Sequence, residues 1–212
     1  MGHVPQEQWE QHYADGLGFQ PLGDGERQVL AEHAPAPQGG GRALEVGCGT
    51  GELAVHLAAT GYTVDAVDLA GAALERARAE HTDAVRVRWR RLDVEHGDPG
   101  EIGELGDGGY DLITLRLAIA FIHDRPRVLR SLGERLRPGG AIVVITPPAG
   151  DTPAERRSVA LDEDEIGLLT VGWETAERLV ADGLAVVVLR GPCHTATRAV
   201  EKKGPATGHA PS

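Results

Sequence analysis

Hydrophobic residues recur along this chain in two spacings, which predict strands and helices in alternation. Short apolar runs are typical of buried strands, and apolar residues three or four positions apart are typical of one helix face. The predicted strands cover residues 43–46, 62–68, 84–92, 110–115, 141–145, 184–189 and 195–200. The predicted helices cover residues 6–14, 25–33, 53–61, 70–80, 125–137 and 173–182. This alternation predicts an α/β fold with a mostly parallel, doubly wound sheet.

The predicted strand at 84–92 differs from the others because apolar and charged residues alternate along it. A strand buried on both faces is apolar throughout, so the alternation predicts an edge strand with one face in water. Its charged face carries Arg86, Arg88 and Arg90. Such a row could bind nucleic acid, but we interpret it as a solvated edge that discourages further strand addition.

The composition of the 212 residues narrows the class of protein. The length fits one domain, and the formal net charge of −11 opposes binding to a phosphate backbone, so nucleic acid is not an expected partner. The only cysteines are Cys48 and Cys193, which gives no support for a disulfide framework. No segment resembles a signal peptide or a membrane span. We therefore expect a cytoplasmic protein without a membrane partner; its oligomeric state stays open.

A turn after the strand at 43–46 contains Gly47, Gly49 and Gly51, which alternate with other residues. Glycine has no Cβ atom, so the main chain can adopt positive φ and approach a ligand closely. The N–H groups at the start of the following helix attract an anionic group. The turn therefore predicts a ligand with a carboxylate or a phosphate.

Two ligand families fit the spacing of this turn. The string Gly49-x-Gly51-x-x-Ala54, with Asp68 roughly 20 residues further on, satisfies the loose dinucleotide fingerprint. The longer string Glu45-x-Gly47-x-Gly49-x-Gly51 resembles the first motif of the class I S-adenosylmethionine-dependent methyltransferases, in which an acidic residue precedes three alternating glycines. The additional carboxylate suits a cationic amino group better than a pyrophosphate, which it would repel.

The resemblance to this family extends over about residues 42–148. Leu92–Val94 is similar to the segment whose acid contacts the adenine amino group, and residues 136–140 are similar to the turn into the fifth strand. The strands at 184–189 and 195–200 fit the antiparallel pair at the end of the family's sheet. The implied fold is a Rossmann-like doubly wound sheet, mostly parallel, with an antiparallel strand pair at the C-terminal end.

The resemblance implies S-adenosylmethionine as the cofactor and S-adenosylhomocysteine as the product. Asp68 lies at the carboxyl end of a predicted parallel strand, where a carboxylate can accept both hydroxyls of a ribose. Asp68 could equally cap the helix that begins at Ala70, and Asp93 could form a turn. The expected cofactor-binding residues are Glu45, Gly47, Cys48, Gly49, Gly51, Asp68, Leu69, Asp93, Val94, Arg116 and Leu117.

His123 is the candidate general base. It follows the fourth strand, where the resemblance locates the methyl acceptor, and a neutral imidazole can accept a proton near pH 7. A structural role before the next helix stays open. His12 and Tyr13 are further candidates because their helix is similar to one that covers the cofactor in many small methyltransferases; that helix could instead dock only by its aromatic side chains. No metal is expected, since Cys193 and His194 lack further ligands in register.

We expect residues 1–41 to form an N-terminal helical cap, residues 42–200 the cofactor-binding domain and residues 201–212 a disordered tail. A loop over residues 149–172 is expected to face the acceptor. The expected function is methyl transfer to a hydroxyl or amine of a small metabolite, mainly by positioning in a closed site. A protein that binds S-adenosylmethionine or a nucleotide without catalysis is the alternative, and an NAD-dependent oxidoreductase is the third.

Overall fold

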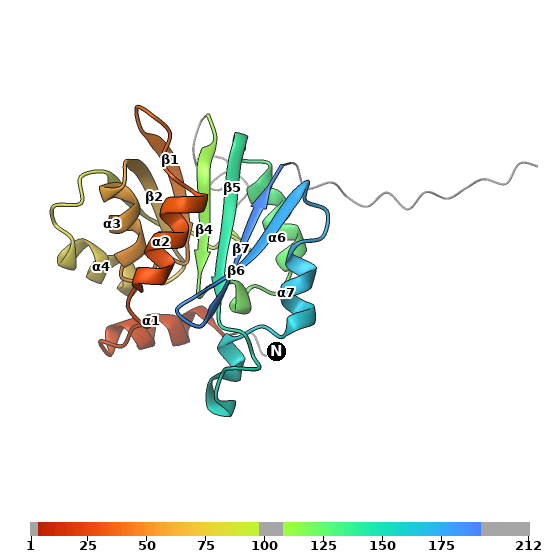
Figure 1. The fold of residues 1–212 in the computed structure, drawn as a ribbon. Coiled ribbons are helices and arrows are strands. Elements are labelled where there is room, and N and C mark those ends of the chain that lie inside the picture. The colour runs from red at the N-terminus through yellow and green to blue at the C-terminus, as the bar shows by residue number, and fades with distance from the viewer. Residues whose placement is uncertain (1–3, 98–107, 192–212) are drawn as a thin grey trace, which may run out of the picture.

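The computed structural model describes residues 4–97 and 108–191. Within these ranges the chain forms a seven-stranded sheet in the order β3-β2-β1-β4-β5-β7-β6 (Figure 1). The strands are β1 Gly41–Val46, β2 Tyr62–Asp68, β3 Val87–Arg91, β4 Tyr110–Arg116, β5 Leu136–Thr146, β6 Thr175–Ala181 and β7 Leu184–Arg190. Strands β1 to β5 are parallel, and β7 runs antiparallel to β5 and β6. The expected Rossmann-like sheet with an antiparallel C-terminal pair is confirmed.

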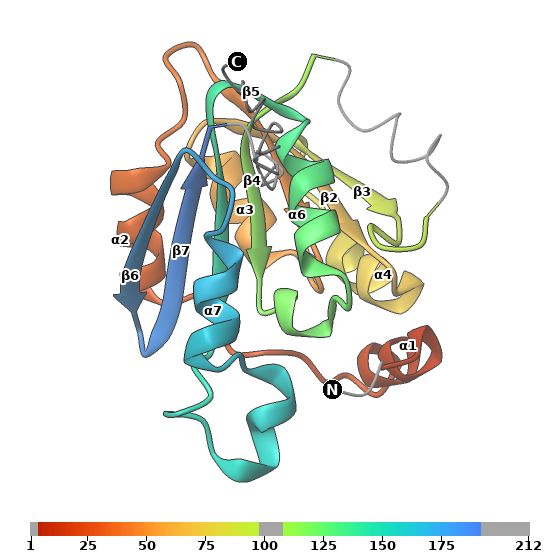
Figure 2. The same cartoon turned by 90° about the vertical axis from the view of Figure 1, so that its right-hand side faces the viewer.

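Helices cover both faces of the sheet (Figure 2). Leu30 and Leu57 of the helices on one face belong to one hydrophobic cluster, and Leu129 and Ile166 on the other face belong to a second. None of the helices in the described ranges is long and apolar enough to cross a membrane. The helices are α1 Gln6–Ala14, α2 Asp24–His33, α3 Glu52–Ala59, α4 Gly71–Glu80, α6 Arg125–Gly133 and α7 Glu163–Leu169, with the 3₁₀ helices η1 Ile119–Phe121 and η2 Ala154–Val159.

Strand β3 lies at one edge of the sheet, as its alternating pattern predicted. It is shorter than expected, because Val85 lies before the strand and is 93% exposed. Its charged face is also more than a solvated surface. The Arg88 guanidinium pairs with the buried carboxylate of Asp65 at 3.0 Å, and the Tyr110 hydroxyl donates to the same carboxylate at 2.8 Å.

The helix predicted at 173–182 is wrong, because this segment is strand β6. Among the described residues β6 pairs only with β7, at the second edge of the sheet, and most of its residues are exposed. A strand that is mostly exposed lacks the period-two pattern by which strands are predicted. The antiparallel pair is therefore β6 with β7, whereas the strand predicted at 195–200 lies outside the described residues.

Two further boundaries differ from the prediction. Helix α6 ends at Gly133, and β5 already begins at Leu136, where it pairs with Tyr110 across a register shift. The segment at 149–172 is not a plain loop, because it contains η2 and α7. Its acidic run starts α7: the Asp162 side chain accepts from the Glu165 backbone N–H at 2.8 Å and caps the helix.

Candidate active site

The glycine turn connects β1 to α3 at the carboxyl end of the sheet. Gly47, Gly49 and Gly51 have φ angles of 70°, 52° and 86°, which other residues rarely adopt. Side chains also pack closely against the turn. A Cβ atom on Gly49 would lie 2.8 Å from the Tyr13 hydroxyl oxygen, and one on Gly51 would overlap the Trp89 ring. The glycines are therefore required by the turn and its packing, before any ligand binds.

Asp68 ends β2 beside this turn and is 7% exposed. Its Oδ2 atom accepts from the Gly49 N–H at 2.8 Å, and its Oδ1 atom accepts from the Ala70 N–H at 2.9 Å. Burial raises the pKa of this carboxyl, and the backbone N–H groups oppose the shift. The cap interpretation of Asp68 is wrong, because the N-cap residue of α4 is Ala70 and the first N–H groups of the helix are bound by Glu10. A carboxylate can accept further hydrogen bonds, so its role toward a ribose stays a prediction.

Glu45 lies near the carboxyl end of β1 and is 3% exposed. Its Oε2 atom has no hydrogen-bond partner among the described residues. Burial raises the pKa of Glu45 to about 8, while the guanidinium of Arg116 lowers it. Glu45 borders a small hollow that residues 47–53 also line. A buried carboxylate with an unpaired oxygen at this hollow fits a cationic group.

Arg116 borders the same hollow, but its guanidinium is held by α2 and the coil before it. It pairs with Glu26 at 2.7 Å and donates to the carbonyl oxygens of Gln20 and Pro21. Sequence reasoning missed Glu26, which is fully buried. It lies 90 residues from Arg116 along the chain, and no local pattern marks it. The expected cofactor contact of Arg116 stays a prediction.

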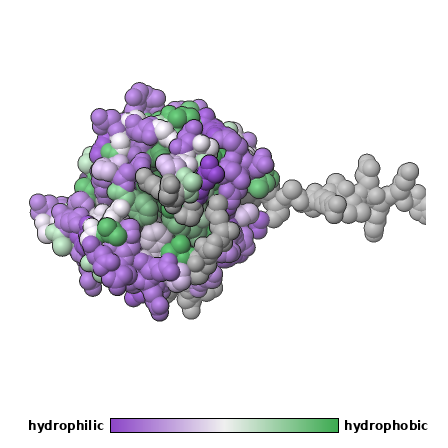
Figure 3. Space-filling model, turned by 90° about the horizontal axis from the view of Figure 1, so that it is seen from below, coloured by the Kyte–Doolittle hydropathy of each residue, from purple (hydrophilic) through white to green (hydrophobic). Residues whose placement is uncertain are grey.

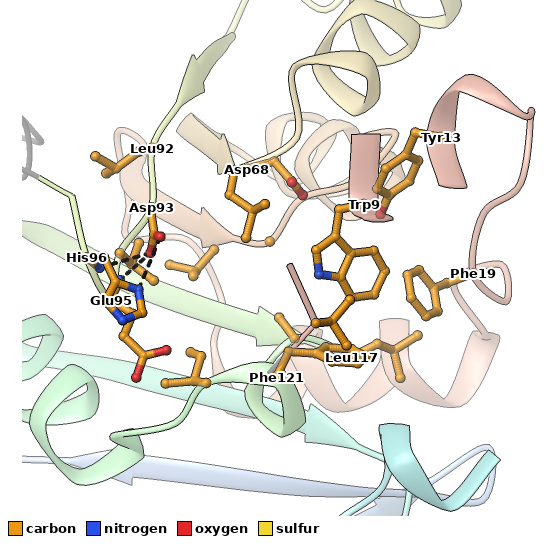
Figure 4. Close-up of a pocket in the computed structure, with 17 residues that line it drawn as sticks. Trp9, Tyr13, Phe19, Asp68, Leu92, Asp93, Glu95, His96, Leu117 and Phe121 are labelled. Atoms are coloured by element: carbon orange, nitrogen blue, oxygen red, sulfur yellow. Dashed lines mark hydrogen bonds and ion pairs between the residues drawn. The ribbon is translucent and has the colours of Figure 1, made fainter. Parts of the chain in front are cut away.

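A larger cavity opens beside Asp68 toward β3 and β4 (Figure 4). Asp93 faces it, and the Asp93 Oδ1 atom accepts from the N–H groups of Glu95 and His96 at 2.8 and 3.0 Å. The turn-forming role considered for Asp93 is therefore present. Cys48 is buried at the smaller hollow. The expected cofactor residues that line the larger cavity are Gly47, Asp68, Leu69, Asp93, Val94 and Leu117.

Helix α1 covers this end of the sheet (Figures 1 and 2). Polar contacts attach it to α4: the two Glu10 carboxylate oxygens accept from the N–H groups of Gly71 and Ala72 at 2.9 and 2.8 Å. Arg91 donates to Glu10 at 3.2 Å, and the Gln6 side chain donates to the Leu69 carbonyl oxygen at 3.1 Å. Partial burial raises the pKa of Glu10, but these N–H groups and Arg91 lower it overall. Glu10 therefore holds α1 over the cavity as an ionised carboxylate.

Glu10→Gln is expected to loosen α1. The amide keeps one acceptor oxygen but loses the charge that the N-terminus of α4 favours, a difference of about 0.3–1 kcal/mol. Amide hydrogen exchange in α1 should become about two- to five-fold faster. The control is Glu32→Gln on α2, whose exposed carboxylate accepts from the Gln28 side chain; this change should leave α1 unaffected. Equal exchange in wild type and Glu10→Gln would show that α1 is held by its aromatic side chains alone.

The catalytic candidates lie at different depths. His123 borders a neighbouring hollow with Gln6 and His96, and its backbone N–H donates to the Glu95 carboxylate. The Nε2 atom of His12 is buried, whereas Tyr13 is buried at the cavity wall, and burial raises its pKa. All three remain candidates.

His96 was missed by sequence reasoning. It lines the larger cavity, and its Nδ1 atom lies 3.3 Å from the Asp93 carboxylate. The only signal in the sequence is its position three residues after Asp93. No group of His, Cys, Asp and Glu within residues 4–97 and 108–191 is arranged to hold a metal ion. Cys193 and His194 lie outside the described residues.

The sequence model of a methyltransferase domain matches residues 44–142, from β1 into β5. Residues 44–142 are a class I methyltransferase domain. This domain contains the glycine turn and the strand ends that carry Asp68 and Asp93. The family resemblance and the Rossmann-like fold expected from the residues are therefore confirmed, whereas the roles of single residues are still predictions.

Relatives of this methyltransferase domain include a trans-aconitate 2-methyltransferase of Deinococcus radiodurans, 33% identical over 148 residues that cover 68% of this chain and 52% of the relative. A ubiquinone biosynthesis O-methyltransferase of Xanthomonas axonopodis pv. citri is 30% identical, with coverages of 73% and 57%. The chain spans about half the length of the curated relatives it matches. The crystal structure of an S-adenosylmethionine-dependent methyltransferase from Aquifex aeolicus has the same fold, with a TM-score of 0.64, 18% identity and coverages of 87% and 97%.

Proposed function

We propose that this chain transfers the methyl group of S-adenosylmethionine to a hydroxyl or amine of a small molecule. The observation that carries the proposal is the unpaired Oε2 atom of Glu45, a buried carboxylate oxygen beside the glycine turn that fits an ammonium group. Asp68 stands at the end of the adjacent strand and supports a ribose contact. The two carboxyl groups fit the amino acid and the nucleoside of an adenosyl amino acid, because an ammonium group stabilises the ionised form of Glu45 and a pyrophosphate does not.

A small acceptor is favoured over a macromolecule. The two curated relatives are named for trans-aconitate and for ubiquinone biosynthesis. The net charge of −11 also opposes a nucleic acid. The cavity lies under α1, whose Trp9 and Tyr13 line it, and a covered cavity suits a ligand that can be enclosed.

Methyl transfer to such an acceptor is an in-line displacement. An acceptor lone pair attacks the methyl carbon while the carbon–sulfur bond breaks; its electrons remain on sulfur as neutral S-adenosylhomocysteine, and the acceptor proton passes to water or to a base. The chain's residues contribute by holding both molecules in line and by excluding water. Glu45 and Asp68 orient one molecule, and the helix that Glu10 fastens covers both.

Titration calorimetry tests the ligand. S-adenosylmethionine and S-adenosylhomocysteine are expected to bind, and NAD to bind much more weakly. Tighter binding of NAD would favour an oxidoreductase and contradict the proposal. A metabolite screen for release of S-adenosylhomocysteine then separates a transferase from a protein that only binds the cofactor.

Cofactor binding is expected to release protons through Glu45. Its pKa of about 8 in the ligand-free chain means that the carboxyl is mostly protonated at pH 7. An ammonium group paired with it lowers this pKa, so about one proton leaves for each cofactor bound. Titrations in buffers of different ionisation enthalpy measure the release. The Glu45→Gln variant should bind the cofactor more weakly and without releasing a proton. An unchanged proton release in this variant would assign the proton to another group.

The same pKa shift affects the ligand-free protein. The folded chain keeps the Glu45 proton up to a pH of about 8, whereas the unfolded chain loses it near 4.5. The folded state therefore binds more protons in this window, and its stability falls as the pH rises through it. The unfolding temperature of the Glu45→Gln variant should therefore fall less than that of the wild type as the pH rises through this window.

Because positioning carries the proposed reaction, His123→Ala is expected to retain turnover within about ten-fold of the wild type, with unchanged cofactor affinity. General base catalysis typically contributes about 10²–10⁴-fold. Steady-state turnover on an acceptor found in the screen measures the effect. A loss in the range of base catalysis would make His123 the base. His12→Ala and Tyr13→Phe are the corresponding tests for the two residues of α1.

A further inference from the structure

Aromatic side chains gather at the larger cavity of a chain that has few of them. Only 4% of the residues are Phe, Trp or Tyr. Both phenylalanines of the sequence, Phe19 and Phe121, line this cavity together with Trp9 and Tyr13. They come from separate segments: α1, the coil after it, and η1 beyond β4 (Figure 4). The concentration is therefore a property of the folded site.

The rings in this cluster pack around Trp9, edge to face with Phe121 and tilted toward Phe19 and Tyr13. The Trp9 and Phe121 centroids lie 4.7 Å apart with the planes at 82°, and Phe19 lies 5.8 Å from Trp9 on another side. Phe19 is 38% exposed, so part of its ring surface is not covered by packing against the core. Seen from this end, apolar residues show near the middle of a mostly hydrophilic surface (Figure 3). Such ring surfaces favour another planar ring over an aliphatic group.

The cavity is lined by more acidic than basic side chains. Glu95 lines it together with Asp68 and Asp93, which are expected to face the cofactor, and its described lining residues include His96 but no lysine or arginine. The Glu95 carboxylate is engaged by the N–H groups of His123 and Asp124. An acceptor with several carboxylates would meet these acidic side chains and no lysine or arginine to pair with. The cavity therefore disfavours an acceptor such as trans-aconitate, a tricarboxylate.

We propose that the acceptor is an uncharged planar aromatic molecule that carries a hydroxyl or amino group on its ring, bound against Trp9, Phe19 and Phe121. This proposal rests on the proposed methyl transfer. The ring oxygen or nitrogen supplies the attacking lone pair, the sulfur receives the electrons of the broken bond, and the hydroxyl or amine proton leaves to water. A protonated aliphatic amine would also be attracted to the rings and acids, but it has no lone pair to attack.

A matched set of acceptors tests this class. Catechol is uncharged and planar, protocatechuate adds a carboxylate to the same ring, and cyclohexanediol keeps two hydroxyls without the aromatic ring. The kcat/KM for release of S-adenosylhomocysteine is expected to be at least ten-fold higher with catechol than with protocatechuate or cyclohexanediol. No release is expected with trans-aconitate. Preference for protocatechuate, trans-aconitate or cyclohexanediol would overturn the proposal.

Binding provides a readout that does not need turnover. Phenol, catechol, naphthol and aniline are titrated into the protein saturated with S-adenosylhomocysteine. At least one is expected to bind, and cyclohexanediol is not. If S-adenosylhomocysteine binds and none of the rings does, the acceptor class is wrong while the proposed function stands. If S-adenosylhomocysteine itself does not bind, the proposed function fails.

Phe121→Leu distinguishes an acceptor contact from simple docking of α1. Loss of one ring contact should raise KM for the aromatic acceptor, or its Kd, by about two- to ten-fold, with KM for S-adenosylmethionine unchanged. Leu168→Ala, an exposed residue of α7 outside the cavity, is the control and should change neither constant. An equal rise for acceptor and cofactor would mean that Phe121 only supports α1.

Discussion

Glu26→Ala is expected to lower the free energy of unfolding by about 3–5 kcal/mol, the cost of removing one partner from a buried ion pair. Glu26 is fully buried, and the Arg116 side chain is 10% exposed. The Glu26 carboxylate accepts from Arg116 Nε at 2.7 Å, from Arg116 Nη2 at 3.0 Å and from the Gly23 N–H at 2.8 Å. The alanine variant leaves a guanidinium without its counter-charge in a site with little water. Denaturant unfolding measures the loss.

An exposed pair in the same protein is the matched control. Glu163 contacts Arg178 through both oxygens, but the two side chains are 68% and 41% exposed. Glu163→Ala should hardly move the unfolding midpoint, because water and salt screen such pairs. Equal effects of Glu26→Ala and Glu163→Ala would contradict the argument from burial. The double variant Glu26→Leu with Arg116→Leu should recover part of the stability, because no charge is then left unpaired.

The residues around the glycine turn show how far the sequence was sufficient. β2 begins and ends as predicted, with Asp68 at its end, because Gly61 separates it from the helix before it and Tyr62, Val64 and Val67 mark the strand. The parallel sheet then brings the ends of β1 and β2 together, so Glu45 and Asp68 meet at one edge. Local pattern and topology were enough for this half of the site.

The other half of the site depends on contacts between distant segments. Glu10 caps α4 from 61 residues away, and Glu26 meets Arg116 across 90 residues. Neither carboxylate stands in a motif, and an amphipathic helix presents several like them. The same limit explains the error at β6, whose strand state comes from pairing with β7 and not from its own pattern.

Asp68→Ala is expected to weaken S-adenosylmethionine binding by about 1.5–3 kcal/mol, the range for charged hydrogen bonds, or about 10- to 150-fold in Kd. Two effects contribute to this loss. The ribose loses its acceptor, and the Gly49 and Ala70 N–H groups lose theirs, so the turn that shapes the cofactor site loosens. Asp68→Asn keeps one oxygen for Ala70 but presents an amide group toward Gly49.

Affinity and stability together separate these effects. Asp162→Ala at the residue that caps α7 is the control, because Asp162 also accepts a backbone N–H near a helix start but does not line either cavity. It should lower the unfolding temperature without changing cofactor Kd. Asp68→Ala should lower the unfolding temperature and also raise the cofactor Kd. The rise in Kd should exceed that of any control variant that is destabilised to the same extent. Unchanged affinity in Asp68→Ala would remove Asp68 from the cofactor site and leave it a backbone tie between the glycine turn and α4.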